Sequence, residues 1–214
     1  MFDIYVHHRL LKTPQGNPVQ APTLALAKAI EEEWEKDASF DFRQKPLTSL
    51  ISTALDLVSE TRDSYIQFTL QAVLSDVILF WETTPESLMK LQKQQWLPLI
   101  EEINESLGLT LKHTISLIIP SLSIEDEDKI RAFVAHLTNF KLAAFAHLVT
   151  LTSSFCLSYL VIQNRLVPEE AWHLAHLHEH EQRRIWGEDR EAVAHEKSQL
   201  NEFLETVHFL KLII

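Results

Sequence analysis

The chain contains one long stretch without a charged side chain, which runs from Leu142 to Asn164. A run of about 20 apolar residues can span a bilayer, but an apolar helix can equally lie buried within a helical bundle. Polar side chains interrupt the run at His147, Thr150, Thr152, Ser153, Ser154, Ser158 and Gln163. We therefore expect a core helix of a bundle and no membrane insertion.

The composition supports a mostly helical fold. Three Gly and eight Pro in 214 residues leave few tight turns, which argues against an all-β sandwich. The hydrophobic content of 46% is enough for a buried core in one large or two small domains.

The N-terminal segment has the alternation of a β-strand. Apolar residues alternate with polar or amphipathic neighbours between Phe2 and Val6, and Gln15-Gly16-Asn17-Pro18 is a turn signal, so we expect a hairpin. The β-branched and aromatic run Asp76–Trp81 is expected either to close this small sheet or to be helical. A further short strand is expected at Leu109–Leu111.

Helical periodicity governs the rest of the chain. It predicts helices over Leu24–Lys36, from Pro46 to about Val58, over Arg62–Val73, from Pro85 to a cap at Gly108, and over Glu125–Thr138, Phe140–Gln163, Pro168–Ile185 and Asp189–Leu210. The predicted fold class is α+β: a small N-terminal α/β domain with a short antiparallel sheet (1–84), followed by a larger all-α helical domain (85–214).

The charge balance excludes some partners. With 30 acidic and 19 basic residues the formal charge is −11, so the chain would repel nucleic acid and anionic lipid.

The single cysteine, Cys156, lies in an apolar run, which suggests a reducing compartment. The first residues carry no export or import signal. We expect a bacterial cytoplasmic protein, although a trimmed protein of the mitochondrial matrix would look the same.

A histidine cluster is the one feature that suggests catalysis. It comprises His173, His176, His178 and His180 beside Glu179 and Glu181. On a helix, His176 and His180 are close enough to share a metal ion, so a metal-dependent enzyme using the His173–Glu181 helix is the alternative function. The cluster lacks the His-Glu-x-x-His order of a zinc protease and an obvious third ligand, which favours a solvated or partner-facing surface. With no nucleophile elbow or nucleotide loop in the sequence, we expect no enzyme, no metal and no cofactor.

The tryptophans differ in their surroundings. Trp34, Trp96 and Trp172 lie on apolar helical stripes, where core packing is expected. Trp186 is instead followed by Gly187, Glu188 and Asp189, which places an aromatic ring at a helix break beside two acids. This break is either an elbow between two helices or a corner that binds a partner.

Several short pieces, taken together, resemble a known family. They are Lys12-Thr13-Pro14, Gly16-Asn17-Pro18, Pro22-Thr23, Leu26-Ala27, Ala29-Ile30, Glu33-Trp34, Pro46-Leu47-Thr48, Thr53-Ala54-Leu55-Asp56, Ser75-Asp76, Gln92, Trp96, Pro98-Leu99, Ala171-Trp172, Glu179, Gln182 and Trp186-Gly187-Glu188-Asp189-Arg190-Glu191-Ala192. In this order and spacing the chain resembles the mitochondrial and α-proteobacterial chaperones for the α subunit of the ATP synthase catalytic head.

The chain also departs from the family pattern, as a divergent member would. His7-His8-Arg9 stands where the family commonly has Asp-Gly-Arg, and Trp96-Leu97-Pro98 where it has Trp-Asp-Pro. His178 replaces an Asp, and Phe80-Trp81 lies near the family's Tyr-Arg pair.

The resemblance implies a chaperone that works without ATP hydrolysis. It would bind the unassembled α subunit and shield its assembly interface until the β subunit replaces it, and we expect a monomer. The residues expected to contact this client lie in the acidic C-terminal corner: Glu179, Gln182, Trp186, Glu188 and Asp189.

Overall fold

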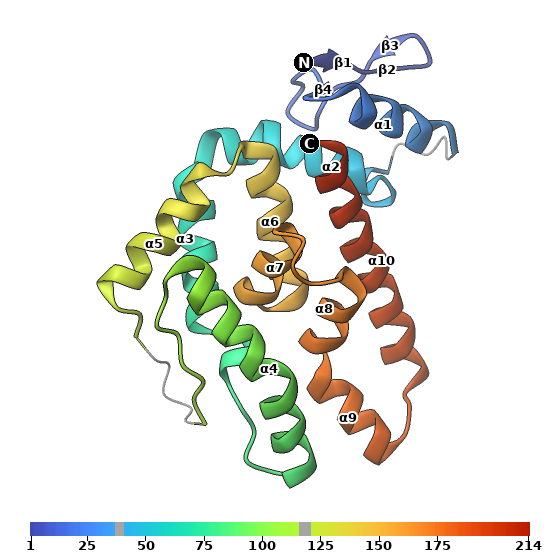
Figure 1. Ribbon diagram of the computed structural model, residues 1–214. Coiled ribbons are helices and arrows are strands. Elements are labelled where there is room, and N and C mark those ends of the chain that lie inside the picture. Colours follow the sequence, from blue (N-terminus) through green and yellow to red (C-terminus); the bar gives the residue numbers. More distant parts are fainter. Residues whose placement is uncertain (37–40, 116–120) are drawn as a thin grey trace.

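Short strands and one helix form a small cap at one end of the molecule (Figure 1). The computed structural model describes residues 1–36, 41–115 and 121–214. Strand β1 (Phe2–Asp3) pairs antiparallel with β4 (Gln20–Ala21), and β2 (Tyr5–Val6) pairs antiparallel with β3 (Arg9–Leu10). Helix α1 (Leu24–Lys36) follows and has the predicted bounds.

The turn between β2 and β3 has a left-handed backbone at two residues that are not glycine. His7 and His8 form a two-residue connection with φ of +47° and +62°. Such a turn favours Asn-Gly or Asp-Gly, because glycine adopts positive φ without steric cost. The Asp-Gly that the family commonly carries fits this backbone better than the two histidines do.

The second turn is fastened to the helical part by Asp56. The Thr13 hydroxyl and the Asn17 side-chain amide each donate to Asp56 Oδ1 at 2.8 Å, and the Gln15 amide donates to Oδ2 at 3.2 Å. Asp56 belongs to a π-helical stretch, Thr53–Val58, and is buried. The predicted turn is therefore present, and a single carboxylate holds it against the helix.

Helices α2 (Pro46–Ser52) and α3 (Ser59–Leu74) continue each other through that π-helical stretch. Pro46 occupies the first turn, as predicted. Thr61 has non-helical angles (φ −123°, ψ 36°), so the boundary predicted near Arg62 is a kink.

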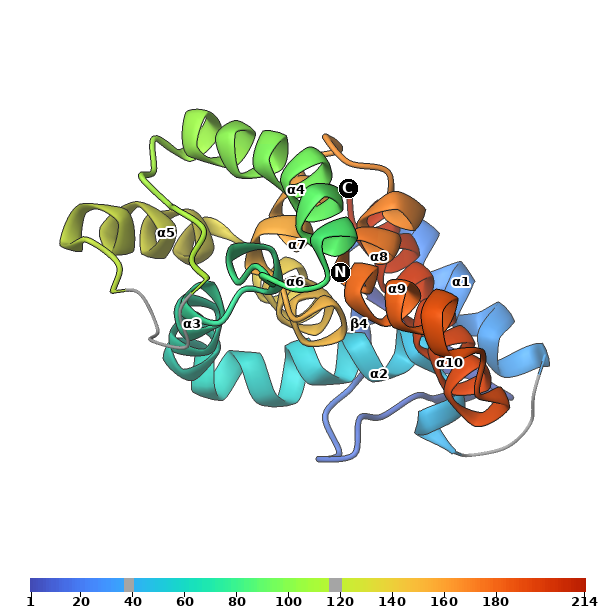
Figure 2. The same cartoon turned by 90° about the horizontal axis from the view of Figure 1, so that it is seen from below.

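Helices α6 (Asn139–Thr152) and α7 (Phe155–Ile162) lie at the centre of the bundle, surrounded by α2, α3, α4, α8 and α10 (Figure 2). The prediction of one helix over Phe140–Gln163 was wrong. Ser153 has a left-handed backbone (φ +49°), and the Ser154 side chain caps α7 by accepting from the Leu157 amide. The serines that interrupt the apolar run therefore end one helix and begin the next.

A buried carboxylate locks this break. Asp76 accepts hydrogen bonds from the Ser154 hydroxyl at 2.7 Å, the Cys156 amide at 2.8 Å and the Ile78 amide at 3.2 Å. Burial raises the pKa of Asp76, and these hydrogen bonds partly oppose the rise.

Of the two alternatives for Asp76–Trp81 the structure has the helical one, and the strand predicted at Leu109–Leu111 was wrong. Val77–Leu79 is a 3₁₀ turn capped by Asp76, although Phe80 makes one isolated parallel bridge with Thr114. Leu109–Leu111 contains no strand, because the Asn104 side chain supplies both backbone partners of Leu111. Its amide donates to the Leu111 carbonyl and its oxygen accepts from the Leu111 amide, each at 2.9 Å.

The remaining helices complete the bundle. They are α4 (Glu86–Leu107), α5 (Ile124–His136), α8 (Pro168–Ala175), α9 (Leu177–Trp186) and α10 (Arg190–Leu212). As predicted, α4 ends at Gly108, which has a left-handed backbone (φ +68°). The single helix predicted over Pro168–Ile185 was wrong, since its backbone breaks at His176.

The architecture is the predicted α+β class, and its core is buried between the helices. Trp34, Trp96 and Trp172 lie in this core as predicted. Within the three described ranges, no helix is both long and apolar enough to cross a membrane. The division into 1–84 and 85–214 stays a prediction.

Candidate partner-binding corner

The five residues predicted to bind a partner lie around one helix break, which we call the corner: Glu179, Gln182, Trp186, Glu188 and Asp189. The break is between α9 and α10, at the end of the molecule opposite the β-strands (Figure 1). Gly187 makes the break with φ of +94°, and its amide donates to the Arg183 carbonyl at 2.9 Å. Asp189 then caps α10, because its Oδ1 accepts from the Glu191 amide at 2.8 Å.

Trp186 is the most exposed aromatic side chain of the corner. It is 84% exposed, whereas Trp34, Trp81, Trp96 and Trp172 are at most 8% exposed. A tryptophan buries a large apolar area when it is covered, and it is enriched among the residues that dominate binding at protein interfaces. The sequence elements that make the elbow therefore also present an uncovered indole.

A pocket of about 460 Å³ lies between α9 and α10. Helix α9 contributes Glu179, Gln182 and Trp186 to its lining, and α10 contributes His195 and Gln199 among others. The structure thus brings together three of the five predicted residues. Glu188 and Asp189 lie just outside the lining, on the connection itself.

Glu196 also lines this pocket and joins the two helices, and it was not identified from the sequence. His180 Nε2 lies 2.7 Å from Glu196 Oε1, and the Arg183 guanidinium donates to Oε2. Burial raises the pKa of Glu196, but the hydrogen bonds from His180 and Arg183 outweigh it, so the pKa is lowered overall. The opposite charges of Arg183 and Glu196 on the two sides of Gly187 were the available signal.

The histidines of the cluster form contacts with protein groups. His180 Nδ1 lies 3.0 Å from His173 Nδ1, and its other nitrogen is held by Glu196, so both of its nitrogens are engaged. The His176 ring stacks on Trp172 with centroids 4.0 Å apart. Burial and the neighbouring His180 lower the pKa of His173. No group of three or more His, Cys, Asp or Glu in the described part of the chain could hold a metal ion.

The acids of this region differ in how far they are already paired. Glu181 receives two hydrogen bonds from Arg184, at 2.7 and 2.8 Å. Glu179 and Glu188 are exposed, and their carboxylates take no hydrogen bond or ion pair from the described residues. These two carboxylates are free to meet basic groups of another molecule.

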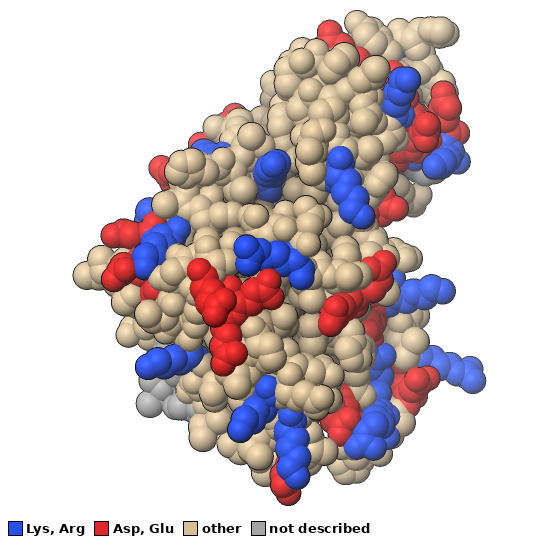
Figure 3. Space-filling model, in the orientation of Figure 1, with Lys and Arg blue, Asp and Glu red and all other residues tan. Residues whose placement is uncertain are grey.

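The surface around the corner has no uniform charge. The face shown in Figure 3 carries acidic and basic side chains interspersed, with wide uncharged areas between them. The one cysteine, Cys156, is fully buried, and burial raises the pKa of its thiol well above the ordinary value. The exposed indole of Trp186 and the unpaired acids beside it are the groups of the corner that a partner could contact.

These features form a candidate partner-binding surface on a helical protein, and comparison with known proteins identifies the family. Residues 1–104 match the family model described as ATP12 chaperone protein. The mitochondrial protein atp12 of Schizosaccharomyces pombe is 30% identical over 197 residues, which cover 86% of this chain and 68% of that protein. The chain belongs to the ATP12 chaperone family, a family of chaperones and not of enzymes, in agreement with the sequence prediction.

Two crystal structures share the whole fold. Atp12 from Paracoccus denitrificans has a TM-score of 0.90 and 32% identity, covering 97% of this chain and 89% of that one. The Atu1473 protein from Agrobacterium tumefaciens has a TM-score of 0.91 and 25% identity, covering 97% of this chain and 78% of that one.

Proposed function

We propose that the chain is an assembly chaperone of the ATP synthase catalytic head. It binds the unassembled α subunit and shields its assembly interface until the β subunit takes its place. Membership of the ATP12 family supports the chaperone role. The resemblance of the sequence to the α-subunit chaperones supports this client.

The observation that carries the proposal is the 84% exposed Trp186 beside the unpaired Glu179 and Glu188. An orphan subunit exposes an apolar assembly interface that aggregates until it is covered. The indole covers apolar surface, and the acids steer the encounter toward basic groups at the rim of that interface.

Release follows from competition. A chaperone must bind tightly enough to suppress aggregation and weakly enough to be displaced by the larger native interface. A small corner with one large aromatic anchor meets both requirements. ATP hydrolysis is not needed for the exchange.

Co-expression with separate α and β subunits tests the proposal. The untagged chain should keep α soluble and co-elute with it in size-exclusion chromatography, and added β should release it. Retention of β in place of α would assign a different client. Retention of neither subunit would refute the proposal.

A further inference from the structure

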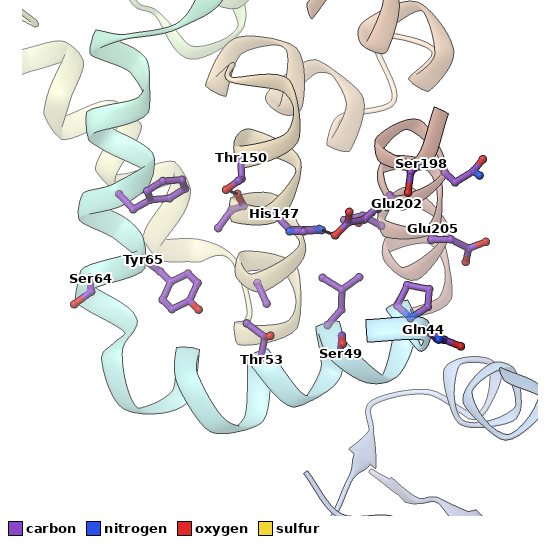
Figure 4. Close-up of a pocket in the computed structure, with 17 residues that line it drawn as sticks. Gln44, Ser49, Thr53, Ser64, Tyr65, His147, Thr150, Ser198, Glu202 and Glu205 are labelled. Carbon is purple, nitrogen blue, oxygen red and sulfur yellow. Dashed lines mark hydrogen bonds and ion pairs between the residues drawn. The ribbon is translucent and has the colours of Figure 1, made fainter. Parts of the chain in front are cut away.

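A second and larger cavity, of about 880 Å³, opens between α3, α6 and α10, with α2 along its lower edge in Figure 4. Its floor is one face of α6, formed by Ala143 and Ala146 with His147 and Thr150. These positions have the spacing of a single helical face. Ala143 and Ala146 are buried, with 2% and 4% of their surface exposed, so His147 and Thr150 are the floor residues that a partner can contact. We call this cavity the groove.

The wall formed by α3 is largely apolar. Phe68 is 41% exposed within it, and the Tyr65 side chain points toward the cavity (Figure 4). The Tyr65 hydroxyl can donate a hydrogen bond to an occupant, and burial raises the pKa of this side chain. This wall therefore presents apolar surface together with one polar group, the Tyr65 hydroxyl.

The opposite wall is acidic. Helix α10 supplies Glu202 and Glu205, and no Lys or Arg is present among the described residues that line the groove. His147 Nε2 lies 2.9 Å from Glu202 Oε1 (Figure 4). Glu202 Oε2 and the exposed Glu205 carboxylate take no hydrogen bond from the described part of the chain. An occupant with Lys or Arg on one side would meet unsatisfied acceptors there.

The dimensions fit a short helix. Along α6 the groove runs from Ala143 to Thr150, and along α10 from Ser198 to Thr206. Each stretch is about 10 to 12 Å long at 1.5 Å per residue, which is about two helical turns. Recognition of an amphipathic helix in such a groove needs apolar anchors on one face at i, i+3, i+4 and i+7.

The groove and the corner are adjacent along one helix. Gln199 of α10 lines the corner pocket, and its neighbour Ser198 lines the groove. Successive helix residues diverge by about 100°, so the two sites open on adjoining sides of α10. A partner that covers the corner can therefore extend around α10 into the groove.

We infer that the groove is a second contact with the client and holds a two-turn amphipathic helix of the unassembled subunit, with its apolar face on Tyr65 and Phe68 and its basic edge on Glu202 and Glu205. This inference rests on the proposed function and adds the kind of client segment that is bound.

Photo-cross-linking locates the contact directly. Benzoylphenylalanine at Phe68 should cross-link to the unassembled α subunit, whereas the same group at the exposed Gln94 of α4 should not. Mass spectrometry of the adduct should place the link on a helical segment that carries Lys or Arg. A cross-link between two copies of this chain, or to an acidic or extended segment, would overturn the inference.

Two kinds of substitution test the groove separately: one blocks it with a large side chain, and the other reverses an acidic charge at its wall. Thr150→Trp fills the groove from an exposed position and should weaken α capture about tenfold, while Gln94→Trp should not. Glu205→Lys should weaken capture about threefold or more, while Glu101→Lys, with the same change in net charge, should not. Thermal melting checks that each variant is folded. Normal capture by folded Thr150→Trp and Glu205→Lys would overturn the groove but leave the proposed function intact.

A peptide assay tests the groove without the client. A synthetic amphipathic Leu/Lys helix should bind the wild-type chain more tightly than a Leu/Glu helix of equal length, and Thr150→Trp should abolish the difference. Equal binding of both peptides, or an unchanged preference in Thr150→Trp, would overturn the groove. If wild-type chain fails to capture α in the first place, the proposed function fails, and the peptide result still decides whether the groove binds basic helices.

Discussion

Two pairs of carboxylates in this chain have opposite surroundings. Asp56 and Asp76 are buried, and each accepts three hydrogen bonds from the chain itself. Glu179 and Glu188 are exposed, and their side chains have no partner in the described residues. All four belong to the pieces by which the chain resembles its family. The residues by which the chain resembles its family are therefore of two kinds. Some stabilise the fold through buried hydrogen bonds, and others are exposed, with side chains that have no hydrogen-bond or ion-pair partner within the described part of the chain.

The buried side of this comparison predicts the largest effect. Asp76→Ala should lower the free energy of unfolding by about 3 kcal/mol, because it leaves the Ser154 hydroxyl and the Cys156 amide buried without an acceptor. Urea denaturation measures the loss, with Glu188→Ala as a matched control that should change stability by less than about 0.5 kcal/mol. Equal losses in the two variants would remove the distinction between them.

Asp56→Ala should lower the free energy of unfolding by somewhat less, about 2 kcal/mol, because two of the three hydrogen bonds that Asp56 accepts are only partly buried. The effect should also be local. Hydrogen exchange should speed up over residues 13–17, where Asp56 holds the turn, while α7 keeps its protection. Uniform loss of protection would show that the turn is not an independent attachment.

An exposed residue can still affect stability through its backbone, and His8 tests this. His8→Gly should stabilise the chain by about 1 kcal/mol, because glycine relieves the cost of φ +62° in a two-residue hairpin turn. The same change at Arg9, which is extended in β3, should destabilise. If neither change alters the urea midpoint, the turn is not under backbone strain.

His173 and Glu196, which lie near the corner, should contribute only a small, pH-dependent stability. Because the folded pKa of His173 lies below its ordinary 6.5, the unfolded chain takes up this proton first, and stability falls as pH drops below about 6.5. Glu196, with a pKa below its ordinary 4.5, loses its contribution as pH falls further through its folded pKa. After solvent screening, we expect the His173 effect to stay below about 1 kcal/mol.

Urea midpoints at pH 7.5 and 5.5 measure this effect. His173→Gln should reduce the difference between the two midpoints relative to the wild-type chain. A larger difference in the variant would contradict the direction of the His173 shift.

The sequence predicted the elements whose signals are local. Helix α1 and the end of α4 follow from apolar spacing and from Gly108, and the core tryptophans follow from their stripes. Trp186-Gly187 was correctly located as a helix break. The sequence could not show which helices and strands lie against each other in space.

The predictions that were wrong, and the features that were missed, have specific physical causes. Ser153 breaks an otherwise continuous apolar helix because a distant carboxylate, Asp76, stabilises the break. Leu109–Leu111 reads as a strand, yet the Asn104 side chain takes the place of a neighbouring strand. Glu196 and the groove depend on how α10 packs beside α9, α6 and α3, which no local pattern contains.

The most direct test measures the affinity of the chain for the unassembled α subunit after the corner is altered. Trp186→Ala combined with Glu188→Lys should weaken binding about tenfold or more while the melting temperature stays within about 2 °C, because neither side chain has a hydrogen-bond or ion-pair partner among the described residues. Glu101→Lys serves as the control for net charge. Unchanged binding by the double variant, or a loss of stability that matches the loss of binding, would contradict the assignment of the corner to the client.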